Sequence, residues 1–195
     1  MSTIVKQVIN EQAFDDLLSE NLKSKSKRHF TSAEVAIKAA KWLVGKDKRK
    51  VLDIGAGVGK FCFFGAHSTG GQFVGIEMRL KLAEIANDIF KQFDIQKAKV
   101  LHGNITDFNF SDFNAFYFYN PFQENLSQHL RLDSSVLLAR EFYFIYSQHT
   151  CLQLASAPKG TRLVTYHGCN FELPQSYTCI QTEENEALKF WLKED

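Results

Sequence analysis

The sequence predicts an α/β fold in which a doubly wound, mostly parallel sheet is covered by helices on both faces. Short apolar runs of the length of buried strands alternate with longer segments in which apolar residues recur at helical spacing. Such alternation is typical of a parallel sheet whose crossover helices pack on either side. A length of 195 residues and a hydrophobic content of 45% fit a single domain, 1–195, with a substantial core.

Residues 1–45 are predicted to form an N-terminal helical segment. Apolar positions over 7–22 have helical spacing, and a basic run over 23–28 follows them. The T-x-x-E pattern that starts at Thr31 has the form of a capping box, so a second helix is expected from there to about Gly45.

The rest of the chain alternates between strands and helices. Helices are expected over about 59–67, 79–93 and 123–157, the last interrupted at 132–135. Strands are expected at 51–54, 72–77, 99–102, 115–119, 161–167, 177–182 and 187–193.

Three glycines at alternate positions follow the first strand: Gly55, Gly57 and Gly59, two, four and six residues after Asp53. Glycine lets a backbone turn tightly and approach a ligand closely, because no side chain stands in the way. The next strand ends on Glu77, where a carboxylate can accept hydrogen bonds from the two hydroxyls of a ribose. Together these features predict a nucleotide-bearing cofactor; a glycine turn that binds nothing is the alternative.

The spacing of the glycines separates the cofactor classes. A dinucleotide fingerprint, G-x-G-x-x-G, needs its third glycine at the position that Lys60 occupies. A P-loop needs Ser or Thr after its lysine, and Phe61 stands there instead. The pattern therefore disfavours a dinucleotide-dependent oxidoreductase and a P-loop nucleotide-binding protein.

The D-x-G-x-G-x-G form resembles motif I of the class I S-adenosylmethionine-dependent methyltransferases, and the resemblance covers roughly residues 30–195. It implies a seven-stranded sheet whose last strands form an antiparallel hairpin. It also implies S-adenosyl-L-methionine as cofactor and S-adenosyl-L-homocysteine as product. Asp53 and the loop Gly55, Ala56, Gly57 and Gly59 would hold the methionine end, Glu77 the ribose, and Met78 would lie beside the adenine.

Two further segments match the family's cofactor-binding positions. By the resemblance, Asn104 would meet the adenine amino group and Ile105 would pack on its ring; an Asx turn at Asn104 is the alternative. Phe30 and Thr31 match two positions of a segment that covers the methionine carboxylate in amino-methyltransferases. A plain helix N-cap at Thr31 is the alternative there.

Asn120-Pro121-Phe122 follows the apolar and aromatic strand 115–119. It is similar to the N-P-P-[YF] motif of amino-group methyltransferases, with one proline in place of two. In that motif the asparagine oxygen and the next backbone carbonyl accept the hydrogens of an amine and so aim its nitrogen. Proline suits this role because it fixes φ and lacks an N–H. The resemblance implies catalytic roles for these three residues and a place for Asn120 beside the cofactor.

These features predict an enzyme that transfers a methyl group from S-adenosylmethionine to a nitrogen nucleophile. A protein or a small molecule is favoured as acceptor, since a net charge of +1 gives no general attraction to nucleic acid or membrane. A nucleic-acid amino-methyltransferase and a non-catalytic cofactor-binding subunit are the alternatives. Residues 131–146, rich in Phe and Tyr, are a candidate lid over the substrate.

Cysteine and histidine usage points to no further chemistry. The four cysteines form no C-x-x-C pair, and no secretory signal or membrane span is recognised, so reduced thiols and a cytoplasmic location are expected. The histidines show no metal-ligand spacing with the cysteines, so no metal site is expected. Nothing in the sequence indicates an oligomeric state.

Overall fold

The structure is a computed structural model that describes residues 9–168 and 173–195. Its described strands are β1 (Lys50–Ile54), β2 (Gln72–Glu77), β3 (Ala98–His102), β4 (Ala115–Phe118), β5 (Arg162–Tyr166), β6 (Tyr177–Glu183) and β7 (Leu188–Lys193). Its α-helices are α1 (Glu11–Asp15), α2 (Glu20–His29), α3 (Ala33–Val44), α4 (Lys60–Thr69), α5 (Leu80–Gln92) and α6 (Arg140–Ala155). Short 3-10 turns occupy Ile105–Asp107, Gln123–Asn125 and Gln128–Leu130.

The described strands form one seven-stranded sheet in the order β3-β2-β1-β4-β5-β7-β6. The first five strands of the chain pair in parallel, and β7 runs antiparallel to both β5 and β6. The predicted fold class, including its C-terminal antiparallel hairpin, is therefore confirmed. The strand order reverses between β1 and β4, and ligands of open α/β sheets bind beyond the strand ends at such a point.

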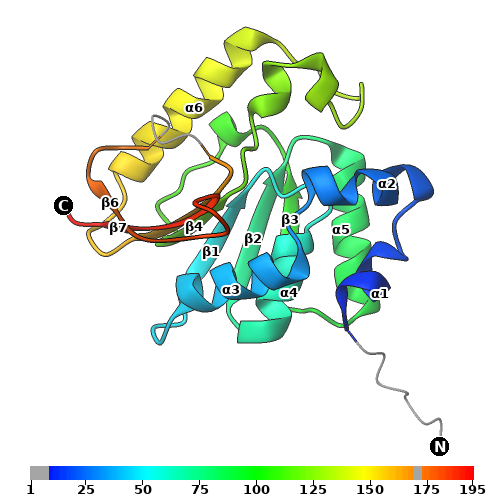
Figure 1. Cartoon of the computed structure of the whole chain (residues 1–195), viewed down its shortest axis with the longest axis horizontal. Helices are drawn as coiled ribbons and strands as arrows, with labels where there is room; N and C mark the ends of the chain where they lie inside the picture. The colour runs from blue at the N-terminus through cyan, green and yellow to red at the C-terminus, as the bar shows by residue number, and fades with distance from the viewer. Residues whose placement is uncertain (1–8, 169–172) are drawn as a thin grey trace, which may run out of the picture.

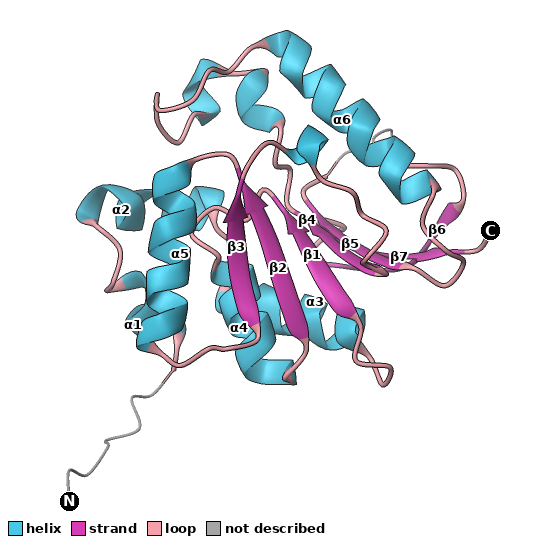
Figure 2. Cartoon of the chain, turned by 180° about the vertical axis from the view of Figure 1, so that it is seen from behind, coloured by secondary structure: helices cyan, strands magenta, loops and turns pink. Residues whose placement is uncertain are grey.

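Helices cover both faces of this sheet (Figures 1 and 2). Helices α3, α4 and α5 pack on one face, where every second strand residue, such as Val51 and Tyr117, belongs to their core. The residues between them, such as Leu52 and Phe116, face α6 on the other side. Strands buried on both faces are apolar along their whole length, which is why their bounds were predictable from the sequence to within one or two residues.

The N-terminal helical segment is more divided than the sequence predicted. In place of one helix over 7–22, α1 ends at Asp15 and α2 begins at Glu20, and residues 7 and 8 lie outside the described residues. The Ser19 hydroxyl accepts a hydrogen bond from the Leu22 N–H and so caps the start of α2. As a result, the basic run 23–28 lies within α2 rather than after a helix.

The predicted capping box at Thr31 is wrong by one position. Ser32 is the N-cap of α3, and its hydroxyl accepts a hydrogen bond from the Val35 N–H. The hydroxyl of Thr31 instead lies 2.8 Å from the Tyr117 hydroxyl in the buried core. Ser and Thr both serve as N-caps, so the tertiary contact with β4 decides between them.

The predicted helix over 123–157, interrupted at 132–135, is confirmed from Arg140 to Ala155 and in its interruption, which lies in a loop. The stretch before the interruption is not an α-helix. Before α6 the chain has two 3-10 turns and then a loop to Ala139. The side chain of Glu124 accepts a hydrogen bond from the Leu132 N–H, and that of Asn125 from the Ala139 N–H. Such side-chain to backbone bonds compete with the helical ladder and hold the segment as a loop.

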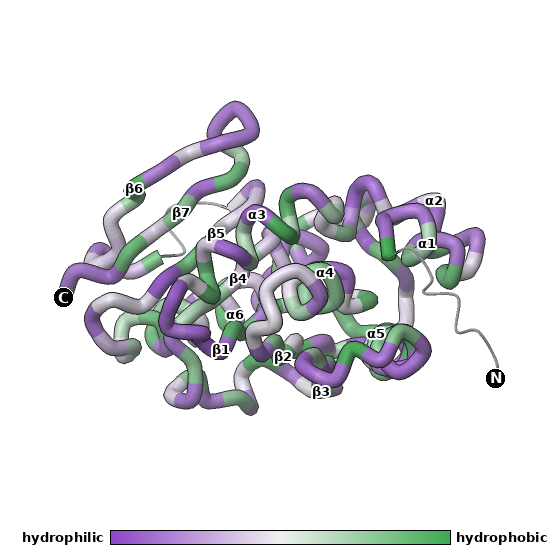
Figure 3. The backbone as a smooth tube through the Cα atoms, turned by 90° about the horizontal axis from the view of Figure 1, so that it is seen from below, coloured by the Kyte–Doolittle hydropathy of each residue, from purple (hydrophilic) through white to green (hydrophobic). Residues whose placement is uncertain are grey.

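Hydrophobic residues concentrate where strands and helices meet, whereas the tip of the β6–β7 hairpin is hydrophilic (Figure 3). Within the two described ranges, none of the helices combines the length and the apolar character needed to cross a membrane.

Candidate active site

A cavity of about 270 Å³ lies at the carboxyl ends of β1, β2, β3 and β4. These strand ends, where the order of the sheet reverses, are the expected place for a ligand in such a fold. Ten of the sequence-predicted site residues line it, namely Phe30, Gly55, Gly57, Glu77, Met78, Asn104, Ile105, Asn120, Pro121 and Phe122. Four others are not among its lining residues, namely Thr31, Asp53, Ala56 and Gly59.

The three glycines of the loop have positive φ angles, but their surroundings differ. A Cβ on Gly55 would overlap the ring of Pro121, and a Cβ on Gly57 would lie 3.2 Å from the Phe30 ring. Gly59 packs against α5, because its Cβ would lie 2.6 Å from Phe90 and 2.9 Å from Ala86. Gly55 and Gly57 therefore shape the cavity, while Gly59 permits close packing of the helix behind it.

Glu77 is the carboxylate that faces the glycine loop. Its Oε2 accepts a hydrogen bond from the Gly57 N–H at 2.9 Å, and its Oε1 accepts one from the Arg79 N–H at 2.8 Å. Burial raises the pKa of Glu77, and these two N–H groups and the Arg79 charge oppose that shift. Each carboxylate oxygen keeps a second lone pair, so Glu77 can still accept hydrogen bonds from a diol in the cavity.

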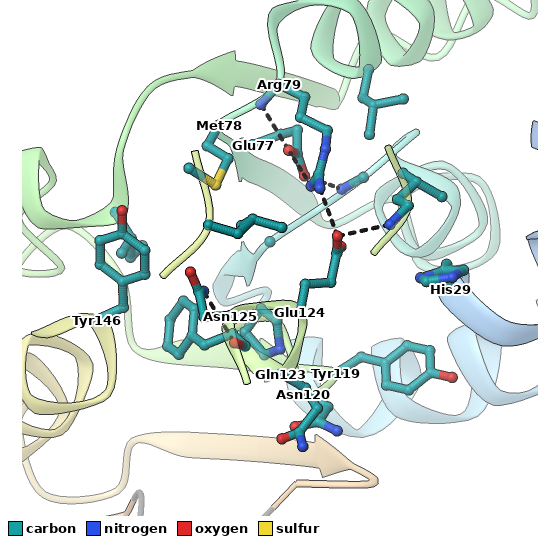
Figure 4. Close-up of a pocket in the computed structure, with 18 of the residues that line it drawn as sticks. His29, Glu77, Met78, Arg79, Tyr119, Asn120, Gln123, Glu124, Asn125 and Tyr146 are labelled. Atoms are coloured by element: carbon teal, nitrogen blue, oxygen red, sulfur yellow. Dashed lines mark hydrogen bonds and ion pairs between the residues drawn. The ribbon is translucent and has the colours of Figure 1, made fainter. Parts of the chain in front are cut away.

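Arg79 connects this carboxylate to the loop on the other side of the cavity (Figure 4). Its guanidinium is 6% exposed and lies 2.6 Å from Glu124 Oε2, 3.0 Å from Asp133 Oδ1 and 3.9 Å from Glu77 Oε1. One buried cation is thus shared by three carboxylates from three segments. The charge of Glu124 is neutralised by this pairing, which leaves Glu124 poorly suited to act as a base.

Asp53 is 3% exposed, and its nearest polar partner is the thiol of Cys62, at 3.5 Å. Burial raises the pKa of Asp53 to about 7, and the charge of Glu77 contributes in the same direction. Burial likewise raises the pKa of the Cys62 thiol. Asp53 therefore keeps its proton to a higher pH than an exposed aspartate does, and it lies in the core beside the cavity rather than in its wall.

The predicted adenine-binding residues Met78, Asn104 and Ile105 all line the cavity. Asn104 forms the Asx-type bond that was the alternative for it, since its Oδ1 accepts from the Thr106 N–H at 3.2 Å. Its Nδ2 also donates to the Tyr146 hydroxyl at 3.2 Å, and Ile105 is buried next to it. Met78 is half-buried and lines the same cavity.

Asn120 occupies a strained position at the end of β4, with φ at 42°. Left-handed backbone of this kind in a residue other than glycine is uncommon and tends to occur at functional sites. Its backbone carbonyl accepts a hydrogen bond from the Gln123 N–H, whereas its side-chain amide has no hydrogen bond to any residue the structure describes. The adjacent Phe122 is buried against Phe118, at a centroid distance of 5.6 Å.

Aromatic and histidine side chains line the cavity next to Asn120. Tyr119 lies 5.8 Å from His167 between ring centroids, and its hydroxyl donates to the backbone carbonyl of Arg28 at 3.0 Å. His167 also has a positive φ, 52°. His29 lies across the cavity from Tyr146 (Figure 4), and burial lowers its pKa, which favours the neutral imidazole.

Lys60 is turned into the interior, although it directly follows the glycine loop. It is 2% exposed, and its ammonium lies 2.7 Å from Glu11, 2.8 Å from Asp15 and 3.1 Å from the Ser26 hydroxyl. The lysine that takes the place of a dinucleotide fingerprint's third glycine therefore anchors α1 and α2 to the start of α4.

Sequence reasoning missed Arg79 as a part of the site. One signal could have indicated it: Arg79 stands two residues after Glu77, at the same end of the sheet. Its partners Glu124 and Asp133 are 45 and 54 residues away in the chain, and no local pattern predicts such pairings. The loop residues Leu132 and Leu138 also line the cavity.

The chain matches no protein-family model, and no curated protein matches it in sequence. Solved structures do share its fold. TrmN from Thermus thermophilus gives a TM-score of 0.64 at 14% identity over 93% of this chain and 52% of TrmN, so the chain spans about half of that protein.

Two further solved structures contain S-adenosyl-L-homocysteine. An RNA methyltransferase from Salinibacter ruber gives a TM-score of 0.58 at 15% identity, over 85% of this chain and 94% of that one. An O-methyltransferase from Bacillus cereus gives 0.57 at 17% identity, over 95% of this chain and 90% of that one. The chain therefore has the fold of these solved methyltransferases.

Proposed function

We propose that this protein is a methyltransferase that uses S-adenosyl-L-methionine and acts on a nitrogen nucleophile. The observation that carries the proposal is that the glycine loop, Glu77 and Asn120 line one cavity at the switch point of the sheet. A turn that binds nothing would need neither a buried carboxylate facing the loop nor a strained asparagine beside it.

The residues present fit the cofactor. Gly57 leaves the cavity open where a Cβ would lie 3.2 Å from the Phe30 ring, and the Glu77 carboxylate can accept hydrogen bonds from the ribose hydroxyls. Asn104, Ile105 and Met78 provide a polar and an apolar surface for an adenine ring. When bound, the cofactor supplies an activated methyl group on a sulfonium.

The protein's own contribution to the reaction is to position the acceptor. The side-chain amide oxygen of Asn120, which has no hydrogen bond to a described residue, can accept an N–H hydrogen bond from an acceptor nitrogen and so direct its lone pair. Orientation of this kind supplies effective molarities of about 10⁵–10⁸ M in well-aligned systems. Because Glu124 is paired with Arg79, the geometry favours positioning over general-base catalysis by that carboxylate.

Calorimetry tests the cofactor assignment. Purified protein is expected to bind S-adenosyl-L-homocysteine and to show no binding of NAD at the same concentration. Gly57→Leu should abolish the binding, since the side chain would collide with Phe30 and fill the cavity. Preference for NAD, or full affinity in Gly57→Leu, would refute the assignment.

Transfer of a labelled methyl group into cell extract tests the enzymatic step. Asn120→Gly removes the carboxamide but keeps a residue that accepts positive φ, so the variant should remain folded. Its rate of methyl transfer should fall by at least about tenfold. Asn21→Ala, on an exposed position of α2, is the matched control. Wild-type transfer by Asn120→Gly would remove Asn120 from the mechanism.

The same labelled extract identifies the acceptor class. Loss of the labelled product on protease treatment indicates a protein acceptor, loss on nuclease treatment indicates a nucleic acid, and resistance to both indicates a small molecule. We expect a protein or a small molecule, in keeping with the nearly neutral net charge of +1.

A further inference from the structure

Two strongly basic side chains, Arg28 and Arg79, belong to the cavity lining. The guanidinium of Arg79 is already shared by Glu77, Glu124 and Asp133. Arg28 is exposed, and no carboxylate among the described residues pairs with it. Arg28 is thus the cation of this cavity that remains available to an anionic group.

The position of Arg28 along the cavity is fixed by its neighbours. It lies in the last turn of α2, and its backbone carbonyl accepts a hydrogen bond from the Tyr119 hydroxyl at 3.0 Å. Two residues later, Phe30 lies over Gly57 of the glycine loop. Arg28 therefore lies beside the loop and the end of β4, whereas Asn104 and Tyr146 bond to each other elsewhere in the lining.

Helix α2 is held firmly enough to present this side chain. Ser26, two residues before Arg28, is buried, and its hydroxyl contacts the Lys60 ammonium at 3.1 Å. Lys25 donates to the backbone carbonyl of Leu132 at 2.6 Å, which ties the same helix to the loop across the cavity. Lys60 directly follows the glycine loop, so α2 and the loop are linked through one buried contact.

We propose that Arg28 pairs with the carboxylate at the amino-acid end of the bound cofactor and is the residue that recognises that group. The inference rests on the proposed function, since it presupposes S-adenosyl-L-methionine in the cavity. With Glu77 on the ribose, an amino-acid end that ran along the glycine loop would reach Phe30 and then Arg28, both of which line the cavity. A guanidinium can bind a carboxylate through two parallel N–H bonds.

The proposal is tested by calorimetry with two ligands that differ in one group. They are S-adenosyl-L-homocysteine and its decarboxylated analogue, S-adenosyl-3-thiopropylamine, which keeps the ammonium. Wild-type protein should bind the first about tenfold more tightly, because a charge-assisted hydrogen bond at an exposed position is partly screened by water. Arg28→Gln should abolish this difference, weakening the first ligand and leaving the second unchanged.

Two further variants sharpen the result. Lys27→Gln removes a neighbouring exposed charge from a residue that does not line the cavity, so it should keep the tenfold difference. Arg28→Lys keeps the charge without the planar fork and should retain part of the difference. Added salt should reduce the difference in the wild type but leave Arg28→Gln unaffected.

The outcomes separate this inference from the proposed function. If Arg28→Gln weakens both ligands equally, or changes neither, the inference is overturned while the cofactor assignment stands. If wild-type protein binds neither ligand, the proposed function fails and this inference fails with it.

Discussion

Gly55 and Pro121 lie against each other where β1 and β4 end, so close that a Cβ on Gly55 would overlap the Cβ of Pro121. Gly55 belongs to the glycine loop, and Pro121 belongs to the Asn-Pro-Phe sequence 66 residues later. The proposed cofactor-binding and acceptor-binding motifs are thus in direct contact, and the position of one constrains the other.

Gly55→Ala is expected to destabilise the protein through this contact. The substitution adds a collision with Pro121 to a φ of 77°, which alanine rarely adopts, so the free energy of unfolding should fall by roughly 2–4 kcal/mol. Urea unfolding followed by circular dichroism measures the change.

A double-mutant cycle separates the two causes. Pro121→Gly removes the Cβ that Gly55→Ala would meet, so the double variant should recover part of the loss while the backbone strain remains. Strictly additive effects would show that the collision contributes nothing.

Glu77→Gln is expected to weaken binding of S-adenosyl-L-homocysteine by about 10- to 100-fold. The substitution keeps the shape of the side chain but removes the charge that strengthens hydrogen bonds from ribose hydroxyls. Glu84→Gln, on an exposed position of α5, is the control. Affinity within twofold of wild type, measured by calorimetry, would argue against the ribose-binding role.

Arg79→Gln should lower the free energy of unfolding by roughly 3 kcal/mol, because it leaves three carboxylates without their shared cation in a mostly buried cluster. Glu124→Gln in the same chain should restore part of the stability by removing one of those charges. Lys81→Gln on the exposed face of α5 serves as the control. Urea unfolding of all four proteins gives the comparison, and equal stability of Arg79→Gln and Lys81→Gln would contradict the prediction.

Asp53 is expected to make folding stability depend on pH. Its pKa is raised from 3.8 to about 7 in the folded protein, so the folded state retains a proton that the unfolded chain releases as pH rises above about 4. Stability from this group is therefore fully present below about pH 4 and is lost as pH rises through about 7. A rise in pKa of this size corresponds to a loss of roughly 4 kcal/mol in the free energy of unfolding across that pH range.

Asp53→Asn removes the titrating group but keeps its shape. Urea unfolding at several pH values between about 4 and about 8 measures the effect. As pH rises, the free energy of unfolding should fall less for the variant than for the wild type. Glu77 titrates in both proteins, so the difference between them reports Asp53 together with its electrostatic coupling to Glu77. Parallel pH profiles would rule out the raised pKa.

Local sequence patterns determined where the strands lie along the chain, how far each extends, and the two motifs at the ends of the first and fourth strands. Strands buried on both faces are mostly apolar, so their extents can be recognised in the sequence. Closely spaced glycines indicate a tight turn, because glycine accepts positive φ. The family resemblance placed Gly55, Glu77, Asn104 and Asn120 around one cofactor. They do line one cavity, because the carboxyl ends of neighbouring parallel strands meet at one edge of the sheet.

Tertiary structure decided which side chains form hydrogen bonds and ion pairs with residues distant in the sequence. Thr31 and Ser32 are both good N-caps, and only the bond from Thr31 to Tyr117 assigns the cap to Ser32. Arg79 pairs with Asp133 across 54 residues of sequence and with Glu124 across 45. Glu124 lies in a stretch whose local pattern indicated a helix and which the structure shows as 3-10 turns and loop. Pairing energies between distant charges depend on distances that only folding sets, so no local pattern could predict them.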